Sequence, residues 1–143
     1  MDTLDAIHTR QGVLRFRPDP VPREMIDTVL AAGAAAPSPV NLQPWAFVVV
    51  TEPELTCRVA RYLVEAQKQR VFDELLEMPA SHIERLMALY KGFERTPCFI
   101  FVCWQPKARF ARPEHERVLR EWHLVSLGAA METLMSAATA LGL

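Results

Sequence analysis

The sequence predicts an α+β fold, rich in helices and with two strands. Two short runs, residues 46–50 and 98–104, consist of apolar, mostly β-favouring residues. Around them, apolar residues recur at steps of three and four, as on one face of a helix. Half of the 143 residues are hydrophobic and 23% are charged, which is typical of a chain that encloses a core. We therefore expect residues 1–143 to form a single domain.

Three helices are predicted outside these runs and before the C-terminal segment. The first, over residues 23–33, follows Pro22, a residue suited to a helix start. Its apolar face contains Ile26, Val29 and Leu30. The other two begin at the capping pattern Ser/Thr-x-x-Glu. One starts at Thr51 and extends to about residue 69, and the other starts at Ser81 and ends near residue 92.

The run 98–104 carries no charge, which predicts a strand covered on both faces and central in its sheet. A basic loop follows over residues 105–113, and the last helix begins at residue 114. Its segment 124–143 has one charged residue, Glu132. The large apolar residues of this segment form a stripe at helical spacing and small residues form the opposite side, so we expect a packed helix at a subunit interface rather than a membrane span. The stripe is Leu124, Leu127, Met131, Leu134, Ala138 and Leu141; the small side is Ser126, Ala129, Ala130, Thr133, Ala137 and Ala140.

Charge and cysteine content exclude several classes of protein. The formal net charge of -1, from 16 basic and 17 acidic residues, creates no field for nucleic acid or an anionic membrane. The three cysteines form no Cys-x-x-Cys pair, and the N-terminus lacks a secretory signal, so we expect a cytoplasmic protein. The four histidines have no zinc spacing, and we expect them at the surface. The sequence contains no glycine-rich dinucleotide or phosphate loop and no Gly-x-Ser-x-Gly element.

A polar loop with three prolines, residues 37–45, leads directly into the first strand. The prolines stiffen its backbone, while the hydroxyl of Ser38 and the amides of Asn41 and Gln43 can face a planar polar ligand. On residue types alone, the alternative is a plain turn that delivers the chain into a buried strand. Trp45 is interpreted as a core residue.

An upstream segment completes a longer pattern. Its residues, in order, are Arg10, Phe16, Pro18-Asp19-Pro20-Val21-Pro22, Ala36-Pro37-Ser38, Asn41 and Gln43-Pro44-Trp45. In order and spacing this pattern resembles the start of the FMN-dependent nitroreductase family. The resemblance implies an antiparallel central sheet flanked by helices, in a homodimer with one FMN in each of two clefts formed by both subunits. Members of the family continue past the motif that ends here at residue 143, so we expect a C-terminally incomplete chain that lacks the C-terminal strands.

The resemblance also implies which residues bind FMN. Arg10, Gln11 and Gly12 would lie against the phosphate and ribityl chain, with the forked guanidinium donating to phosphate oxygens. The ring and ribityl hydroxyls would be contacted from the opposite subunit by Ser38, Pro39, Asn41 and Gln43. Without the motif, Arg10 would be interpreted as a surface arginine paired with a carboxylate.

Two positions depart from the family pattern. Gly12 stands where the family usually has serine, which removes a hydroxyl. Leu14 stands where a cation often faces the flavin, and a cation there would stabilise the negative charge of the reduced ring. The redox tuning of the flavin is therefore in doubt.

The activity implied by the resemblance is hydride transfer from NADH or NADPH to FMN, followed by ping-pong transfer to a nitroaromatic, a quinone or an activated alkene. No side chain is assigned as catalytic, because the flavin carries the hydride chemistry. Leu14 and the early end leave a second hypothesis, a flavin-binding or dimer-forming protein without turnover. A third is a relative that consumes or rearranges its flavin or acts on a specialised metabolite.

Overall fold

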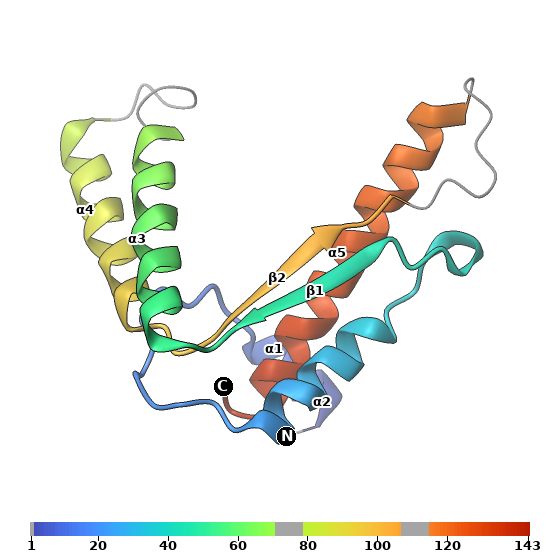
Figure 1. The fold of residues 1–143 in the computed structure, drawn as a ribbon, viewed down its shortest axis with the longest axis horizontal. Helices are drawn as coiled ribbons and strands as arrows, with labels where there is room; N and C mark the ends of the chain where they lie inside the picture. The colour runs from blue at the N-terminus through green and yellow to red at the C-terminus, as the bar shows by residue number, and fades with distance from the viewer. Residues whose placement is uncertain (1, 71–78, 107–114) are drawn as a thin grey trace. The chain divides into compact units, whose positions relative to one another are not determined.

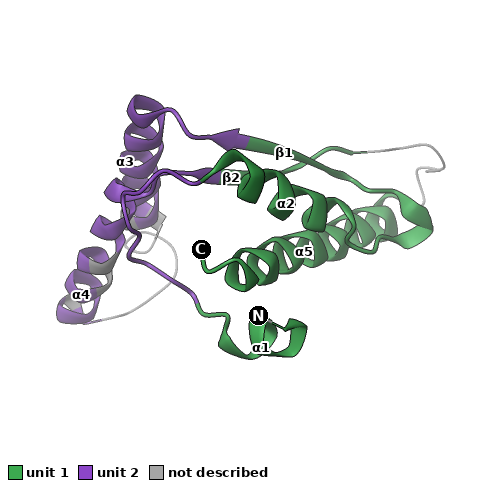
Figure 2. Cartoon of the chain, turned by 90° about the horizontal axis from the view of Figure 1, so that it is seen from below, with its two compact units in different colours: residues 1–11, 22–48, 100–143 green, residues 12–21, 49–99 purple. Residues whose placement is uncertain are grey.

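The computed structural model describes residues 2–70, 79–106 and 115–143 (Figure 1). It divides into two compact units (Figure 2). The first unit contains residues 1–11, 22–48 and 100–143, and the second contains residues 12–21 and 49–99. The chain passes between the units several times, so neither is a continuous segment. That residues 1–143 form one domain stays a prediction.

The first unit is built on a long helix and most of a two-stranded sheet. Strand β1 (Trp45–Val50) pairs with β2 (Phe99–Trp104), and the two arrows run in opposite directions in Figure 1. The Gln105 N–H donates to the Pro44 carbonyl at 2.9 Å, just beyond the strand ends. Three helices complete this unit: α1 (Thr3–Thr9), α2 (Arg23–Ala34) and α5 (Glu116–Ala140). The predicted α+β class is confirmed.

The core of the first unit lies where β1 meets α5. Ala36, Trp45 and Ala130 are buried together, which confirms Trp45 as a core residue. Helices α2 and α5 approach closely at Gly33: a methyl group placed there would lie 2.7 Å from the Leu134 side chain. Because glycine has no side chain, the two backbones can pack at this separation.

Helix α5 packs with parts of both predicted sides: Ser126 and Ala130 belong to the small side, and Leu134 belongs to the predicted stripe. Its buried residues are His123, Ser126, Ala130 and Leu134. Leu124 and Met131, from the predicted stripe, are exposed, so that part of the prediction is wrong. Both sides of the segment are apolar, and the periodicity of apolar residues cannot tell which side a neighbouring helix selects. The side of α5 that packs lies between the two predicted ones, where Gly33 of α2 leaves room for Leu134.

A set of large apolar residues is therefore left exposed on α5. We call this set the apolar face of α5: Val118, Trp122, Leu124, Val125, Met131 and Met135. In the part of the chain that the structure describes, no helix is long and apolar enough to cross a membrane.

Strand β2 is less covered than its composition predicts. Its residues are half-buried up to Cys103, and Trp104 is 50% exposed. Within the described residues β2 pairs with β1 alone, so the predicted central position in a sheet is not met there. Residues 107–113 of the predicted basic loop and the predicted helix start at residue 114 lie outside the described residues.

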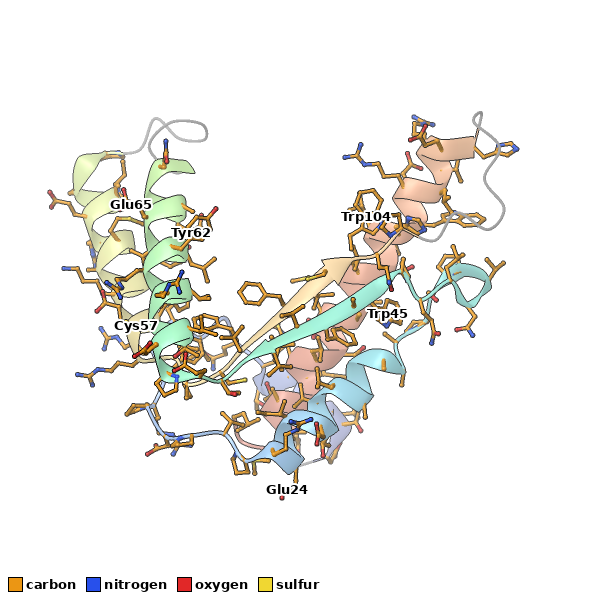
Figure 3. The ribbon with its side chains drawn as sticks, in the orientation of Figure 1. Glu24, Trp45, Cys57, Tyr62, Glu65 and Trp104 are labelled. Carbon is orange, nitrogen blue, oxygen red and sulfur yellow. The ribbon has the colours of Figure 1, made fainter. Side chains whose placement is uncertain are left out.

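The second unit contains the helices α3 (Pro53–Arg70) and α4 (Ala80–Tyr90) and the short 3₁₀ helix η3 (Lys91–Arg95). Cys57, Tyr62 and Glu65 project from α3 in Figure 3. This unit contains a cluster of three aromatic rings. Phe16, from the linker of residues 12–21, stacks on Phe93 with 5.8 Å between ring centroids. Phe93 in turn contacts Tyr90, at 5.4 Å.

The predicted capping boxes of α3 and α4 are wrong in detail. The carboxylate of Glu52, not Thr51, accepts the first N–H groups of α3, from Glu54 at 3.0 Å and from Leu55 at 2.8 Å. Glutamate reaches the same donors as a hydroxyl and also places negative charge at the positive end of the helix dipole. Helix α4 begins at Ala80, so Ser81 lies inside it.

We predict that alanine at Gly33 destabilises the protein, whereas alanine at Gly128 does not. Alanine favours a helix by about 1 kcal/mol over glycine at both positions. At Gly33 the new methyl group overlaps Leu134, a cost of about 1–3 kcal/mol, while at Gly128 nothing lies within 4 Å. Denaturant unfolding should show Gly33→Ala below and Gly128→Ala at or above the wild type. Equal effects of the two substitutions would contradict the packing described here.

Candidate functional site

Arg10 ends helix α1. The helix begins at Asp2, whose side chain accepts the N–H of Leu4 at 2.7 Å, and it ends where the Arg10 N–H donates to the Ala6 carbonyl at 3.0 Å. At Arg10 the backbone leaves the helical conformation, with φ -56° and ψ 129°. The side chain is thus presented at a fixed point, since α1 packs on α5.

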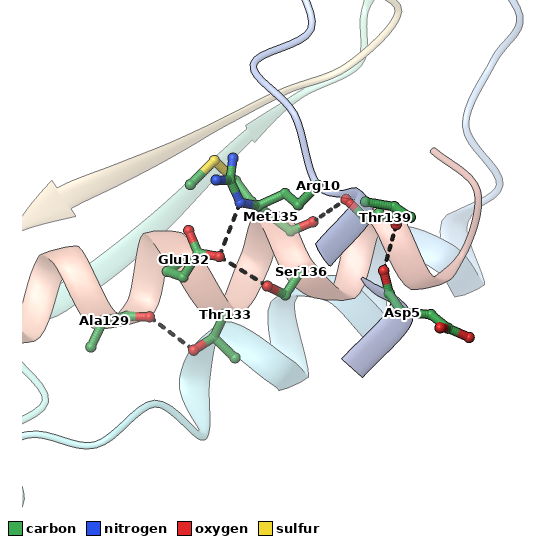
Figure 4. A network of polar contacts seen from close by, with 9 residues as sticks. Asp5, Arg10, Ala129, Glu132, Thr133, Met135, Ser136 and Thr139 are labelled. Carbon is green, nitrogen blue, oxygen red and sulfur yellow. Dashed lines mark hydrogen bonds and ion pairs between the residues drawn. The ribbon is translucent and has the colours of Figure 1, made fainter. Parts of the chain in front are cut away.

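The guanidinium of Arg10 lies against a carboxylate of α5. Its Nε is 3.1 Å from Oε1 of Glu132, and the same oxygen accepts a hydrogen bond from the Ser136 hydroxyl at 3.1 Å (Figure 4). The alternative interpretation of Arg10, pairing with a carboxylate, is therefore realised. However, the Nε is buried and its N–H is not aimed well enough at the carboxylate to form a hydrogen bond. In the described chain the buried Nε of Arg10 thus has an ion-pair partner but no hydrogen-bond acceptor.

Gln11 and Gly12 follow Arg10 in exposed, irregular backbone. Gly12 belongs to the second unit, so its placement near Arg10 in space is not described. A methyl group added at Gly12 would meet nothing within 4 Å. Packing therefore does not require glycine at this position, and the serine of the family pattern would fit.

The predicted ligand loop has an unusual backbone. It contains the 3₁₀ turn η1 (Pro39–Asn41), and Val40, Asn41 and Gln43 have φ of 45°, 55° and 46°. Such values are tolerated by asparagine but costly for a β-branched residue, and Val40 is 74% exposed, so its own burial does not offset the cost. Strained residues of this kind cluster at ligand sites.

Two features hold this loop in place. The Ser38 hydroxyl accepts the Gln43 N–H at 2.9 Å, which closes the loop across five residues. The apolar residues Leu42 and Pro44 are buried beneath it. Pro39 is half-buried and Asn41 is exposed. The Ser38 hydroxyl thus has a structural role, and its proton remains available to a ligand.

Arg10 and the loop lie at different points along α5. Pro44 is hydrogen-bonded to Gln105, and the Trp104 indole donates to Nδ1 of His123 at 3.1 Å, which places this end of the sheet beside His123 (Figure 3). Arg10 contacts Glu132, nine residues further along α5. At 1.5 Å per residue these contacts are about 13 Å apart along the helix axis, and nine residues, about two and a half turns, place them on opposite sides of α5. Among the described residues no hydrogen bond or ion pair joins the two halves of the predicted site within one chain.

His123 is buried, so the expectation that all four histidines lie at the surface is wrong. Nδ1 accepts the indole proton, so the neutral ring carries its own proton on Nε2, which is buried without a partner in the described chain. Burial lowers the pKa of His123, because the charged ring would be desolvated. Isolated histidines give no sequence signal for burial. Glu132, which the family motif does not include, was marked in the sequence as the single charged residue of an apolar segment.

The other reactive side chains form no site. Within residues 2–70, 79–106 and 115–143, no three His, Cys, Asp or Glu residues gather as metal ligands. The three cysteines are half-buried free thiols. Burial raises the pKa of the Cys98 thiol, which disfavours its reactive thiolate.

A family model described as the nitroreductase family matches residues 7–143. An NADH dehydrogenase of Thermus thermophilus is 43% identical over 53 residues, which are 37% of this chain and 26% of that protein. A Staphylococcus epidermidis protein provisionally named an NAD(P)H nitroreductase is 27% identical and matches 98% of this chain and 69% of its own length. In three relatives with short matches, the matched segment spans 21% to 29% of the relative.

Solved structures share the fold. A BluB-like flavoprotein of Clostridium difficile superposes with a TM-score of 0.71 at 26% identity, over 99% of this chain and 71% of that one. A nitroreductase of Bacteroides fragilis with bound FMN gives a TM-score of 0.65 at 19% identity, over 99% of this chain and 66% of that one.

We predict that His123 makes stability fall as the pH falls below about 6.5, the ordinary histidine value. The pKa of the folded state is lowered, so the unfolded chain binds a proton that the folded protein resists, and stability is complete only above the unfolded pKa. Unfolding measured from pH 7.5 to 5 should show a shallower decline for His123→Gln than for the wild type. His8→Gln, at an exposed histidine of α1, is the control and should keep the wild-type slope. Parallel curves for wild type and His123→Gln would contradict the assignment.

Proposed function

Because the chain belongs to the nitroreductase family, we propose that it binds FMN and passes hydride from NADH or NADPH through the flavin to a small electron acceptor. The acceptor class is a nitroaromatic, a quinone or an activated alkene. The observation that carries the proposal is Arg10: a partly buried guanidinium, held at a helix end, whose buried Nε lacks a hydrogen-bond acceptor in the described chain.

The residues present fit the parts of FMN. The forked donors of Arg10 suit phosphate oxygens, and Gln11 and Gly12 follow it directly in the sequence. The amides of Asn41 and Gln43 would bind the polar edge of the ring; the left-handed backbone at both residues and the stiffness of Pro39 support a fixed loop. When bound, the flavin supplies the hydride chemistry. The protein residues hold and orient it.

The same proposal includes a homodimer. The apolar face of α5 exposes six large side chains on one helix, and such a patch is typical of an interface. Arg10 contacts Glu132, which is also exposed on α5. A second copy on this face would bring its own ligand loop toward Arg10, which offsets the separation of about 13 Å along α5 within one chain.

Leu14 favours a second candidate function, a flavin-binding protein without turnover. The carbonyl of Leu14 packs against Gly92, so a side chain at Gly92 would displace the linker. Leucine at this position brings no positive charge to a reduced flavin, which would lower the reduction potential.

We predict that Arg10→Ala weakens FMN binding about tenfold to a hundredfold, as expected when charged hydrogen bonds to a phosphate are lost. Riboflavin has no phosphate, so its affinity should not change. Flavin fluorescence titration measures both. Arg23→Ala is the matched control, since Arg23 is paired with Asp27 and lies outside the predicted site. A wild-type protein that binds no FMN would overturn the proposed function.

The absorption of the bound flavin distinguishes the two candidate functions. Under anaerobic conditions, NADH or NADPH should bleach the oxidised flavin absorption if the protein is a reductase. Stable binding without bleaching would favour the second candidate.

We predict that Val125→Glu dissociates the dimer. Val125 is 70% exposed in the single chain, and a glutamate buried there between two copies would lack a partner. The dimer dissociation constant should rise at least about a hundredfold. Analytical ultracentrifugation measures it, with Tyr62→Glu on α3 as the control because Tyr62 is equally exposed but lies elsewhere. An unchanged dimer in Val125→Glu would place the interface on another surface.

A further inference from the structure

We propose that Glu132 is a positioning residue for phosphate binding: it holds the Nε edge of Arg10 so that the two terminal nitrogens are presented to the FMN phosphate. This inference rests on the proposed function and adds a residue to it. The sequence pattern that indicates the site ends at Trp45, so it contains no residue of α5.

The contacts separate two edges of the guanidinium. Glu132 Oε1 lies 3.1 Å from Nε, the contact that Figure 4 marks between the two side chains. No other ion pair of Arg10 occurs within the described residues. Two parallel terminal N–H groups are the donor pair that binds two phosphate oxygens at once. The carboxylate therefore engages the edge that a phosphate does not need.

Glu132 is itself held in position. Ser136, one helical turn further along α5, donates to the same Oε1 at 3.1 Å. The Thr133 and Thr139 hydroxyls bind helix carbonyls instead, at 2.8 and 2.9 Å, so they do not compete for this carboxylate. Helix α5 is also fixed by its packing on α2. Helix α5 and Ser136 thus fix the carboxylate of Glu132, and this carboxylate in turn contacts Arg10 at the end of α1.

The positioning and the charge of Glu132 have opposite effects on the affinity for FMN, so variants can separate them. As a charge, Glu132 repels a phosphate and weakens the field of Arg10. As a support, it removes the freedom that a long side chain otherwise loses on binding. Glutamine keeps the shape of the side chain and an oxygen that accepts from Ser136 but removes the charge. Alanine removes both.

The test compares FMN and riboflavin affinities of the purified chain with Glu132→Ala, Glu132→Gln and Ser136→Ala. Freeing one long side chain corresponds to roughly a threefold to tenfold loss, which we expect for FMN in Glu132→Ala, with riboflavin unchanged. Glu132→Gln should bind FMN at least as tightly as the wild type. The FMN affinity of Ser136→Ala should lie between those of the wild type and Glu132→Ala. Asp27→Ala, which removes another carboxylate paired with an arginine Nε, is the matched control and should have no effect.

A second readout follows Arg10 without flavin. In the apo-protein, the side-chain Nε–H signal of Arg10 in NMR relaxation should become more mobile in Glu132→Ala but not in Glu132→Gln. Ultracentrifugation of each variant checks that the oligomeric state is unchanged.

The outcomes are distinguishable. Tighter FMN binding by both Glu132→Ala and Glu132→Gln would show that the carboxylate acts only as a competing charge, and would overturn the inference. Equal affinities of all variants would overturn it too. If Arg10→Ala loses FMN while Glu132→Ala does not, the inference fails and the proposed function stands. If the wild type binds no FMN, both fail.

Discussion

The packing of α5 on α2 is the constraint from which the other features follow. The two helices meet at Gly33 and Leu134, a contact so close that a side chain at Gly33 would overlap Leu134. Since α5 has two apolar sides and the chain covers one, its large residues remain outside. The same rotation of the helix places Glu132 outside, where Arg10 reaches it. One glycine thus determines which surface is left for a partner and where the guanidinium lies.

The two halves of the candidate site are built by different physics. Arg10 is positioned by helix ends and an ion pair, which need no strain. The loop is positioned by a hydroxyl contact, buried apolar residues and left-handed backbone at Val40, Asn41 and Gln43. The free protein already holds the loop in these strained conformations. Ligand binding therefore need not supply the free energy of ordering it.

Much of the fold could be predicted from the sequence, because it depends on local patterns. The strand starting near Trp45 and the helices around Ile26 and Leu134 follow from runs and periodicity. The capping of α3 by Glu52 could not be foreseen from a hydroxyl-based pattern, because a glutamate one position along reaches the same N–H groups. The burial of His123 and the exposed face of α5 depend on tertiary contacts that no local pattern records.

The candidate site divides in the same way. The motif identified Arg10 and the loop, but the pairing of Arg10 with Glu132 joins residues 122 positions apart, and sequence spacing carries no information on it. The strain at Val40 is likewise invisible, since valine is a residue that ordinarily avoids that backbone conformation.

The central claim is that one flavin site takes its guanidinium from one copy and its amide loop from another. Mixing two defective chains tests it directly: Arg10→Ala, and the double variant Asn41→Ala with Gln43→Ala, at an FMN concentration too low to fill the weakened sites of either variant alone. After subunit exchange, a shared site predicts that one of the two sites in each mixed dimer is intact, so FMN binding returns at about a quarter of all sites. No return of FMN binding in dimers shown to be mixed would contradict the account, because sites formed within single chains would all remain defective.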